Sequence, residues 1–112
     1  MGTEVIAHCE CGLDATIMIG AGFADFPHVC LFPAFCEKCR QVVQANLAKD
    51  PARCPECRST DIFPYDEPAL SKGDGTQTIT RWGDHILTDA HYQCPACGNM
   101  TLRFAESGLL WD

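Results

Sequence analysis

Eight of the nine cysteines occur in four close pairs, and this spacing constrains the fold more than any other feature of the sequence. The pairs are Cys9/Cys11, Cys36/Cys39, Cys54/Cys57 and Cys94/Cys97. A tight turn around such a pair, here called a knuckle, directs two sulfurs at one point, and two knuckles provide four thiolates for a tetrahedral Zn²⁺ site. Disulfide frameworks seldom place nearly all of their cysteines in close doublets. We therefore predict that these eight cysteines are metal ligands in two sites that hold two Zn²⁺ ions.

The length of the chain, 112 residues, allows one domain or two very small ones. Units of about 50 residues usually need a metal, disulfides or a partner to be stable. We predict two units, residues 1–50 and 51–112, each organised around one metal centre. The first residues lack the basic stretch and long apolar run of a secretory signal, and no apolar run is long enough to span a bilayer. We therefore expect a soluble, cytoplasmic protein in a reducing compartment, with no membrane partner.

The pattern outside the knuckles predicts a small, mainly β protein with a short helix between the two units. Alternating or β-branched residues indicate strands at 3–8, 13–19, 61–65 and 100–104, and a hairpin whose strands 76–82 and 85–93 flank a Gly83-Asp84 turn. Apolar residues three and four apart favour a helix at 40–49, although a strand is also possible there. The Phe- and Pro-rich segment 23–35 is interpreted as an irregular loop. Gly12 and Gly98, directly after their knuckles, are expected to take positive φ.

Cys54-x2-Cys57, a hairpin, and then Tyr92-x-Cys94-x2-Cys97-Gly98 with an alternating strand resemble a zinc ribbon. The resemblance covers residues 54–105 well and residues 4–48 more loosely, so the chain looks like two ribbons in tandem. It implies a three-stranded sheet with a structural Zn²⁺ at one end of each unit. It implies no particular activity, because zinc ribbons serve many different functions.

Three pairings of the knuckles are compatible with the sequence. The expected one is sequential: the first knuckle joins the second, and the third joins the fourth. A nested pairing would join Cys36/Cys39 with Cys54/Cys57 across a short spacing and leave the two terminal knuckles to each other. A cross-brace would join the first with the third and the second with the fourth. At the first knuckle, His8 is an alternative ligand to Cys9, because imidazole also binds Zn²⁺ well.

Few residues remain for catalysis once eight sulfurs are assigned to closed sites. Cys30, the ninth cysteine, is interpreted as an inert buried thiol. His28, His85 and His91 are interpreted as surface or hairpin residues rather than ligands. The sequence contains no evident catalytic triad, carboxylate pair or phosphate loop. We therefore expect a protein that is not an enzyme, with no catalytic residues and no organic cofactor.

The formal net charge of −7 bears on the choice of partner. Two Zn²⁺ bound by eight thiolates would add four further negative charges, and such a surface repels phosphate backbones. The expected function is therefore that of a zinc-binding structural or adaptor protein that binds another protein. A nucleic-acid-binding ribbon is an alternative, with a local basic cluster at 38–58 (Lys38, Arg40, Lys49, Arg53 and Arg58) and Phe63 and Tyr65 nearby for stacking. A second alternative is an iron electron carrier, because the CPxC knuckles and Cys97-Gly98 are similar to those of rubredoxins.

Overall fold

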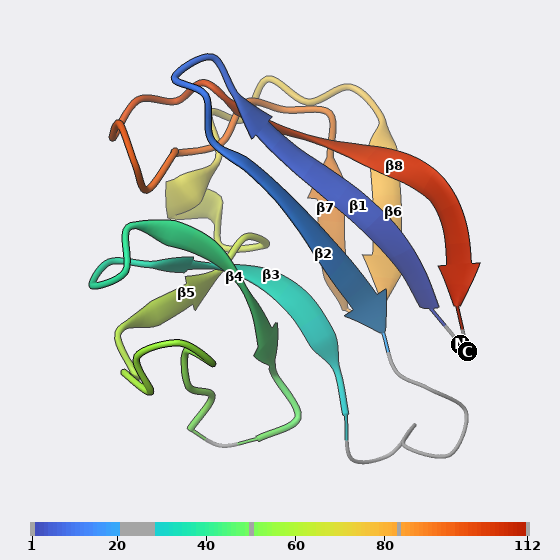
Figure 1. Cartoon of the computed structure of the whole chain (residues 1–112). Helices are drawn as coiled ribbons and strands as arrows, with labels where there is room; N and C mark the ends of the chain where they lie inside the picture. Colours follow the sequence, from blue (N-terminus) through green and yellow to red (C-terminus); the bar gives the residue numbers. More distant parts are fainter. Residues whose placement is uncertain (1, 21–28, 50, 83, 112) are drawn as a thin grey trace.

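A computed structural model describes residues 2–20, 29–49, 51–82 and 84–111. Within these ranges the chain is built from eight strands and a 3₁₀ turn (Figure 1). The elements are β1 (Gly2–Cys9), β2 (Asp14–Gly20), β3 (Leu31–Cys36), β4 (Gln41–Asn46), β5 (Ile62–Pro64), the 3₁₀ turn η2 (Pro68–Leu70), β6 (Thr78–Trp82), β7 (His85–Thr88) and β8 (Leu102–Trp111). The predicted mainly β fold is confirmed.

The strands form two similar antiparallel groups of three. In the first group β1 lies between β2 and β8, and in the second β3 lies between β4 and β5. The two groups meet at the pair Gly20↔Leu31, which makes one six-stranded sheet. In each group the first two strands form a hairpin, and the third strand pairs with the first strand of that hairpin.

The predicted helix at residues 40–49 is wrong, because this segment contains β4. Residues 41–46 pair with β3 along their whole length, from Cys36↔Gln41 to Leu31↔Asn46. The adjacent β-branched residues Val42 and Val43 suit a strand, and the knuckle at Cys39 already sets the chain into a hairpin. The apolar spacing that favoured a helix is local, and the pairing with β3 outweighs it.

The segment interpreted as an irregular loop also contains a strand, β3. Pro33 lies in the middle of it, where a missing backbone N–H would normally break the pairing. Its carbonyl accepts from the Tyr65 N–H at 3.1 Å, so this backbone position faces away from β4. The pairing with β4 therefore loses no donor at Pro33. Residues 23–28, the first part of the predicted loop, lie outside the described residues.

The predicted hairpin is confirmed as β6 and β7, with Trp82 opposite His85. Gly83, the expected first residue of its turn, lies outside the described residues. The second predicted strand is shorter than expected, because β7 ends at Thr88 and an irregular segment leads to Cys94.

A cluster of aromatic side chains forms the centre of the core and connects the two strand groups. The Tyr65 ring contacts Phe35 of the second group and Tyr92 and Phe104, with ring centroids 6.4, 5.8 and 5.1 Å away. Tyr92 and Phe104 also meet edge to face at 5.2 Å. Aliphatic residues such as Leu87 extend the same core. Strands from both sides of residue 50 thus share one sheet, and each of the two hydrophobic clusters of the described residues draws on both sides. The predicted division into units 1–50 and 51–112 stays a prediction.

Candidate metal centres

The four knuckles have closely related backbone conformations. In the knuckle that begins at Cys54, the Cys54 carbonyl accepts from the Arg58 N–H at 2.9 Å, and the Cys54 N–H donates to the Ser59 carbonyl at 2.9 Å. The knuckle that begins at Cys94 repeats both bonds at 2.8 Å, with Gly98 and Asn99. The first and second knuckles have the matching bond, from the N–H of Gly12 to the Cys9 carbonyl at 3.0 Å and from the N–H of Arg40 to the Cys36 carbonyl at 2.9 Å.

The structure brings the eight predicted cysteines together in two groups of four. The first cysteine group consists of Cys9, Cys11, Cys94 and Cys97, and the second cysteine group of Cys36, Cys39, Cys54 and Cys57. The arrangement is therefore nested, and the expected sequential pairing is wrong. Figure 1 shows the reason: β8 returns to lie beside β1, and β5 lies beside β3. The knuckle at Cys94 precedes β8 and the knuckle at Cys54 precedes β5. Because each of these strands pairs with the first strand of a hairpin, its knuckle lies beside the knuckle of that hairpin.

The spacing of the sulfurs fits a tetrahedral metal ion. In the first group Cys9 and Cys97, and Cys11 and Cys94, have their Sγ atoms 3.7 Å apart. The second group has the same 3.7 Å separations between Cys36 and Cys57 and between Cys39 and Cys54. All four sulfurs of each group lie within 4.8 Å of one another. A tetrahedron with metal–sulfur bonds of about 2.3 Å has edges of about 3.8 Å, so each group has the size of a four-thiolate site.

The electrostatics of the groups also favour a central cation. Backbone N–H groups of Ser59 and Asn99 lower the pKa of the Cys57 and Cys97 thiols to about 7. By contrast, desolvation raises the pKa of Cys94 to about 12. Four sulfurs this close together cannot all ionise unless a positive charge lies between them. A divalent metal supplies that charge and displaces the remaining thiol protons.

Hydrogen bonds orient several of the sulfurs. The Thr101 hydroxyl lies 3.1 Å from the Cys9 Sγ atom and donates to it when Cys9 is a thiolate. In the second group the backbone N–H groups of Cys39 and Glu56 donate to the sulfurs of Cys36 and Cys54, each at 3.4 Å. Partners of this kind fix the ligand orientation in metal sites. Thr101 was not identified from the sequence, where it is simply an alternating polar residue of a strand.

The residue directly after each knuckle has positive φ, as predicted for Gly12 and Gly98. The first knuckle has only one residue between its cysteines, and Gly12 reaches a φ of 102°, where a side chain is strained. At the equivalent position after Cys39 and Cys57 the chain has Arg40 and Arg58, with φ of 54° and 61°. These values lie in the small left-handed region that non-glycine residues can occupy at a cost.

The alternative ligand His8 lies outside the first cysteine group. Its Nδ1 atom is 2.6 Å from Asp14 Oδ1, and both side chains are exposed. Cys30 is also outside both groups and is half-buried, and its backbone N–H donates to Asn46 Oδ1 at 2.9 Å. Desolvation, followed by the charge of Asp66, raises the pKa of the Cys30 thiol. This environment disfavours the thiolate that a reactive cysteine needs.

The remaining described histidines pair with carboxylates rather than with sulfur. His85 Nδ1 lies 2.6 Å from Asp66 Oδ2, and the His85 ring packs on Phe32. His91 contacts Asp74 through both its backbone N–H and its Nδ1 atom, at 2.9 and 2.7 Å. These two bonds, the backbone one first, lower the pKa of Asp74 to about 2. His28 lies outside the described residues.

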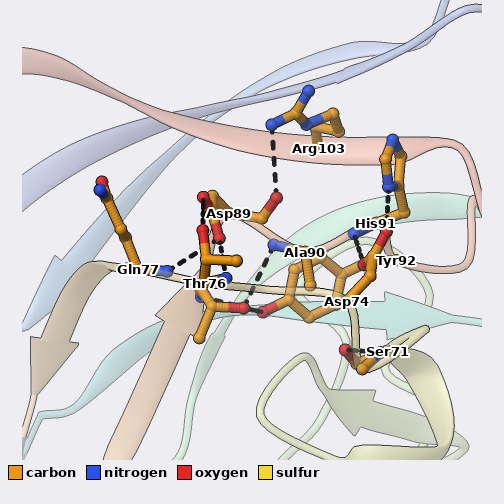
Figure 2. A network of polar contacts seen from close by, with 11 residues as sticks. Ser71, Asp74, Thr76, Gln77, Asp89, Ala90, His91, Tyr92 and Arg103 are labelled. Carbon is orange, nitrogen blue, oxygen red and sulfur yellow. Dashed lines mark hydrogen bonds and ion pairs between the residues drawn. The ribbon is translucent and has the colours of Figure 1, made fainter.

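A polar network fixes the segment that leads from β7 to Cys94 (Figure 2). The Asp89 carboxylate accepts from the backbone N–H groups of Thr76 and Gln77 and from the Thr76 hydroxyl, at 2.7 to 3.1 Å. The Asp89 carbonyl accepts from Arg103 of β8 at 3.3 Å. The Tyr92 hydroxyl accepts from the Thr88 N–H at 3.0 Å. The network ties the loop after η2 to the segment that precedes the last knuckle and to β8, and no sequence motif indicated it.

Comparison of the chain with family models, with curated proteins and with solved structures gave no match. The two cysteine groups are compatible with zinc-ribbon-like units, since each lies at one end of three antiparallel strands. Among the described residues no helix is long and apolar enough to cross a membrane.

Proposed function

We propose that this protein binds two Zn²⁺ ions in its two cysteine groups and acts as a structural or adaptor component through contact with another protein. The observation that carries the metal part is the pair of four-sulfur clusters with 3.7 Å separations. A site with four cysteine ligands leaves no coordination position for water or substrate, which is typical of structural rather than catalytic zinc. We propose on the same ground that the protein is not an enzyme.

Zinc is proposed in preference to iron, although both metals accept four thiolates in a tetrahedron. Two rubredoxin-like iron centres in one chain would be unusual, and the long separation of Cys11 from Cys94 within the first cysteine group departs from the compact layout of rubredoxins. Elemental analysis of the purified chain tests the choice. We expect two zinc atoms per chain and a colourless protein. A red protein that contains iron would refute the choice of zinc, and cysteines oxidised to one another would refute metal binding altogether.

Two features support a protein partner. β8 is ten residues long and pairs with β1 on one side, while on its other side Leu102 is bridged to Tyr92 and no further strand pairing is found among the described residues. Such edges commonly accept a strand from a partner. The acidic net charge of −7 disfavours nucleic acid as the main partner.

We further propose that the protein works in a reducing, cytoplasmic environment, because its thiols must stay reduced to bind metal.

Affinity purification from native cells tests the partner. We expect a specific protein to be recovered with the wild-type chain, and to be lost when the β8 edge is blocked by Glu106→Pro, which removes one backbone N–H. The exposed substitution Glu67→Ala, outside the knuckles and β8, serves as a control that should leave recovery unchanged. Equal recovery with Glu106→Pro and with wild type, at matched stability, would refute β8 as the docking edge. Absence of any specific protein would refute the adaptor function.

The nucleic-acid alternative loses one of its two expected stacking residues. Tyr65 is only 1% exposed and its hydroxyl donates to the Gln93 carbonyl, so it cannot stack on a base. Phe63, on the same strand segment, is 46% exposed and remains available. A mobility-shift assay at low salt tests this alternative, and no shift there would exclude it.

A further inference from the structure

Basic side chains line a groove beside the second cysteine group. The groove has a volume of about 730 Å³ and lies between the end of β4 and the knuckle at Cys54. Lys49, Arg53 and Arg58 contribute three positive charges, and Gln44 and Asn46 add amide groups. None of the described residues that line it is acidic. The lining is thus positively charged in a chain whose net charge is −7. We call this site the cationic groove.

Two of the three cations have no partner in the described part of the chain. The side chains of Lys49 and Arg58 make no hydrogen bond or ion pair there, whereas Arg53 Nη1 donates to the Arg58 carbonyl at 3.2 Å. The bond holds Arg53 along the knuckle beside Arg58. The charges of Lys49 and Arg58 are thus available to a ligand.

Comparison with Arg40 distinguishes the two arginines that directly follow a knuckle. The φ of Arg58, 61°, lies in the left-handed region, and the equivalent position of the last knuckle is occupied by Gly98. Arg40 has the same kind of φ, but its Nη2 atom donates to the Ala96 carbonyl at 3.0 Å and so links the two cysteine groups. The described structure offers no such contact for Arg58. The positive φ thus belongs to the knuckle turn at both arginines, and the side chain of Arg58 differs from that of Arg40 in having no internal contact among the described residues.

Neutralisation of bound thiolates does not account for this charge. A divalent metal with four thiolates carries two negative charges, and basic residues near it would offset them. The first cysteine group would carry the same charge, yet its own knuckles contain Glu10 and no Lys or Arg, and the one cation among the described residues that reaches them is Arg40, through the Ala96 carbonyl. The basic residues therefore belong to one side of the second group rather than to metal binding in general.

The size and surroundings of the groove select a compact ligand. A volume of about 730 Å³ falls in the range of small-molecule sites, roughly 300–1,000 Å³. Arginine forks bind phosphate and carboxylate oxygens, and Leu31 and Pro55 provide apolar surface for an uncharged part of the ligand. A long polyanion would have to cross the acidic remainder of the surface. We propose that the cationic groove binds a compact phosphate-bearing small molecule, such as a nucleotide, through Lys49, Arg53 and Arg58. This proposal does not depend on the adaptor function.

A titration of the purified full chain with adenosine diphosphate, monitored by NMR at low ionic strength, tests the proposal. We expect saturable shifts of backbone amides at residues 46–49 and 53–59, with the metal content unchanged at the end. Inorganic phosphate should shift the same amides more weakly, because it lacks the apolar part. An absence of saturable shifts would overturn the proposal.

Matched variants distinguish the contribution of the groove's cations to affinity from the effect of the overall charge of the protein. Arg58→Gly removes one cation while glycine accepts the backbone conformation, so the fold is retained and affinity for adenosine diphosphate should fall about tenfold. Lys49→Gln should have a similar effect. Lys38→Gln, which removes a cation outside the groove, should change affinity less than about twofold. Equal losses in Lys38→Gln and Arg58→Gly would refute the assignment.

Two further ligands distinguish compact phosphates from macromolecules. Oligothymidylate of about a dozen nucleotides and oligoglutamate are titrated under the same conditions. We expect both to bind more weakly per site than adenosine diphosphate. Tighter binding of oligothymidylate would replace the proposal with a nucleic-acid site, and tighter binding of oligoglutamate would replace it with an acidic-peptide site.

Discussion

Tyr65 allows a quantitative test of how the two strand groups are held together. Its hydroxyl donates to the Gln93 carbonyl at 2.9 Å, directly before Cys94 of the first cysteine group. Burial raises the pKa of Tyr65 well above its usual range, so the hydroxyl stays a donor at all working pH values. Tyr65→Phe removes the donor and leaves a carbonyl with one partner fewer. We expect this change to lower the free energy of unfolding by about 1–3 kcal/mol.

Tyr65→Leu should cost more, because it also removes the ring. The two closest ring contacts, with Phe104 at 5.1 Å and Tyr92 at 5.8 Å, are each worth about 0.5–1.5 kcal/mol beyond buried area. A residual cavity adds to this, and the total loss is expected at about 3–5 kcal/mol. Phe63→Leu is the matched control. It lies two residues away and is 46% exposed, so it should cost less than about 0.5 kcal/mol.

Urea unfolding, monitored by circular dichroism, measures these differences. Metal content must be determined for each variant, because loss of metal would break the two-state comparison. A Tyr65→Phe variant within about 0.3 kcal/mol of wild type would refute the role of this hydrogen bond. Equal costs for Tyr65→Leu and Phe63→Leu would refute the central position of the aromatic cluster.

Three other predictions concern Gly75, Gly12 and the thiols of Cys57 and Cys97. Gly75→Ala places a new Cβ 2.5 Å from the Thr88 Oγ1 atom, so it should destabilise the protein by about 1–3 kcal/mol in the same unfolding assay. Gly12→Ala forces a side chain to a φ of 102° in the short first knuckle, and should cost about 1–2 kcal/mol and accelerate metal loss to a chelator. In the metal-free chain, thiol pKa values of about 7 at Cys57 and Cys97, below the ordinary 9.0, mean that the stabilisation from these thiolates is complete above pH 9 and is lost as pH falls through about 7. Bound metal competes with protons for the same thiolates, so metal retained after dialysis should fall only at lower pH, and equal retention at pH 8 and at pH 3 would contradict this.

The knuckles were predictable because their chemistry is local. Four cysteine pairs at close spacing favour metal-binding turns over disulfides, and Gly12 and Gly98 mark the ends of two of these turns. The positive φ of Arg40 and Arg58 was not predictable, since arginine gives no sign of a left-handed backbone. Only comparison of all four knuckles at equivalent positions would have indicated it.

The pairing of the knuckles was not predictable from local pattern, because β1 and β8 come from opposite ends of the chain. The one available signal was the short spacing between Cys39 and Cys54, which favours a local site. The helix predicted at 40–49 was wrong for a related reason. The apolar spacing of this segment suits a helix, and its pairing with β3 makes it the strand β4. Long-range strand pairing thus sets both the grouping of the knuckles and the conformation of β4, and sequence periodicity does not report that pairing.

The most direct test of the nested arrangement is the metal content of two reciprocal variants, each with four serine substitutions. One replaces Cys9, Cys11, Cys94 and Cys97, and the other replaces Cys9, Cys11, Cys36 and Cys39. If the grouping described here is correct, the first variant keeps the whole second cysteine group and binds one zinc per chain tightly, while the second keeps only two half-sites and binds none tightly. One tightly bound zinc in the second variant and none in the first would contradict the account.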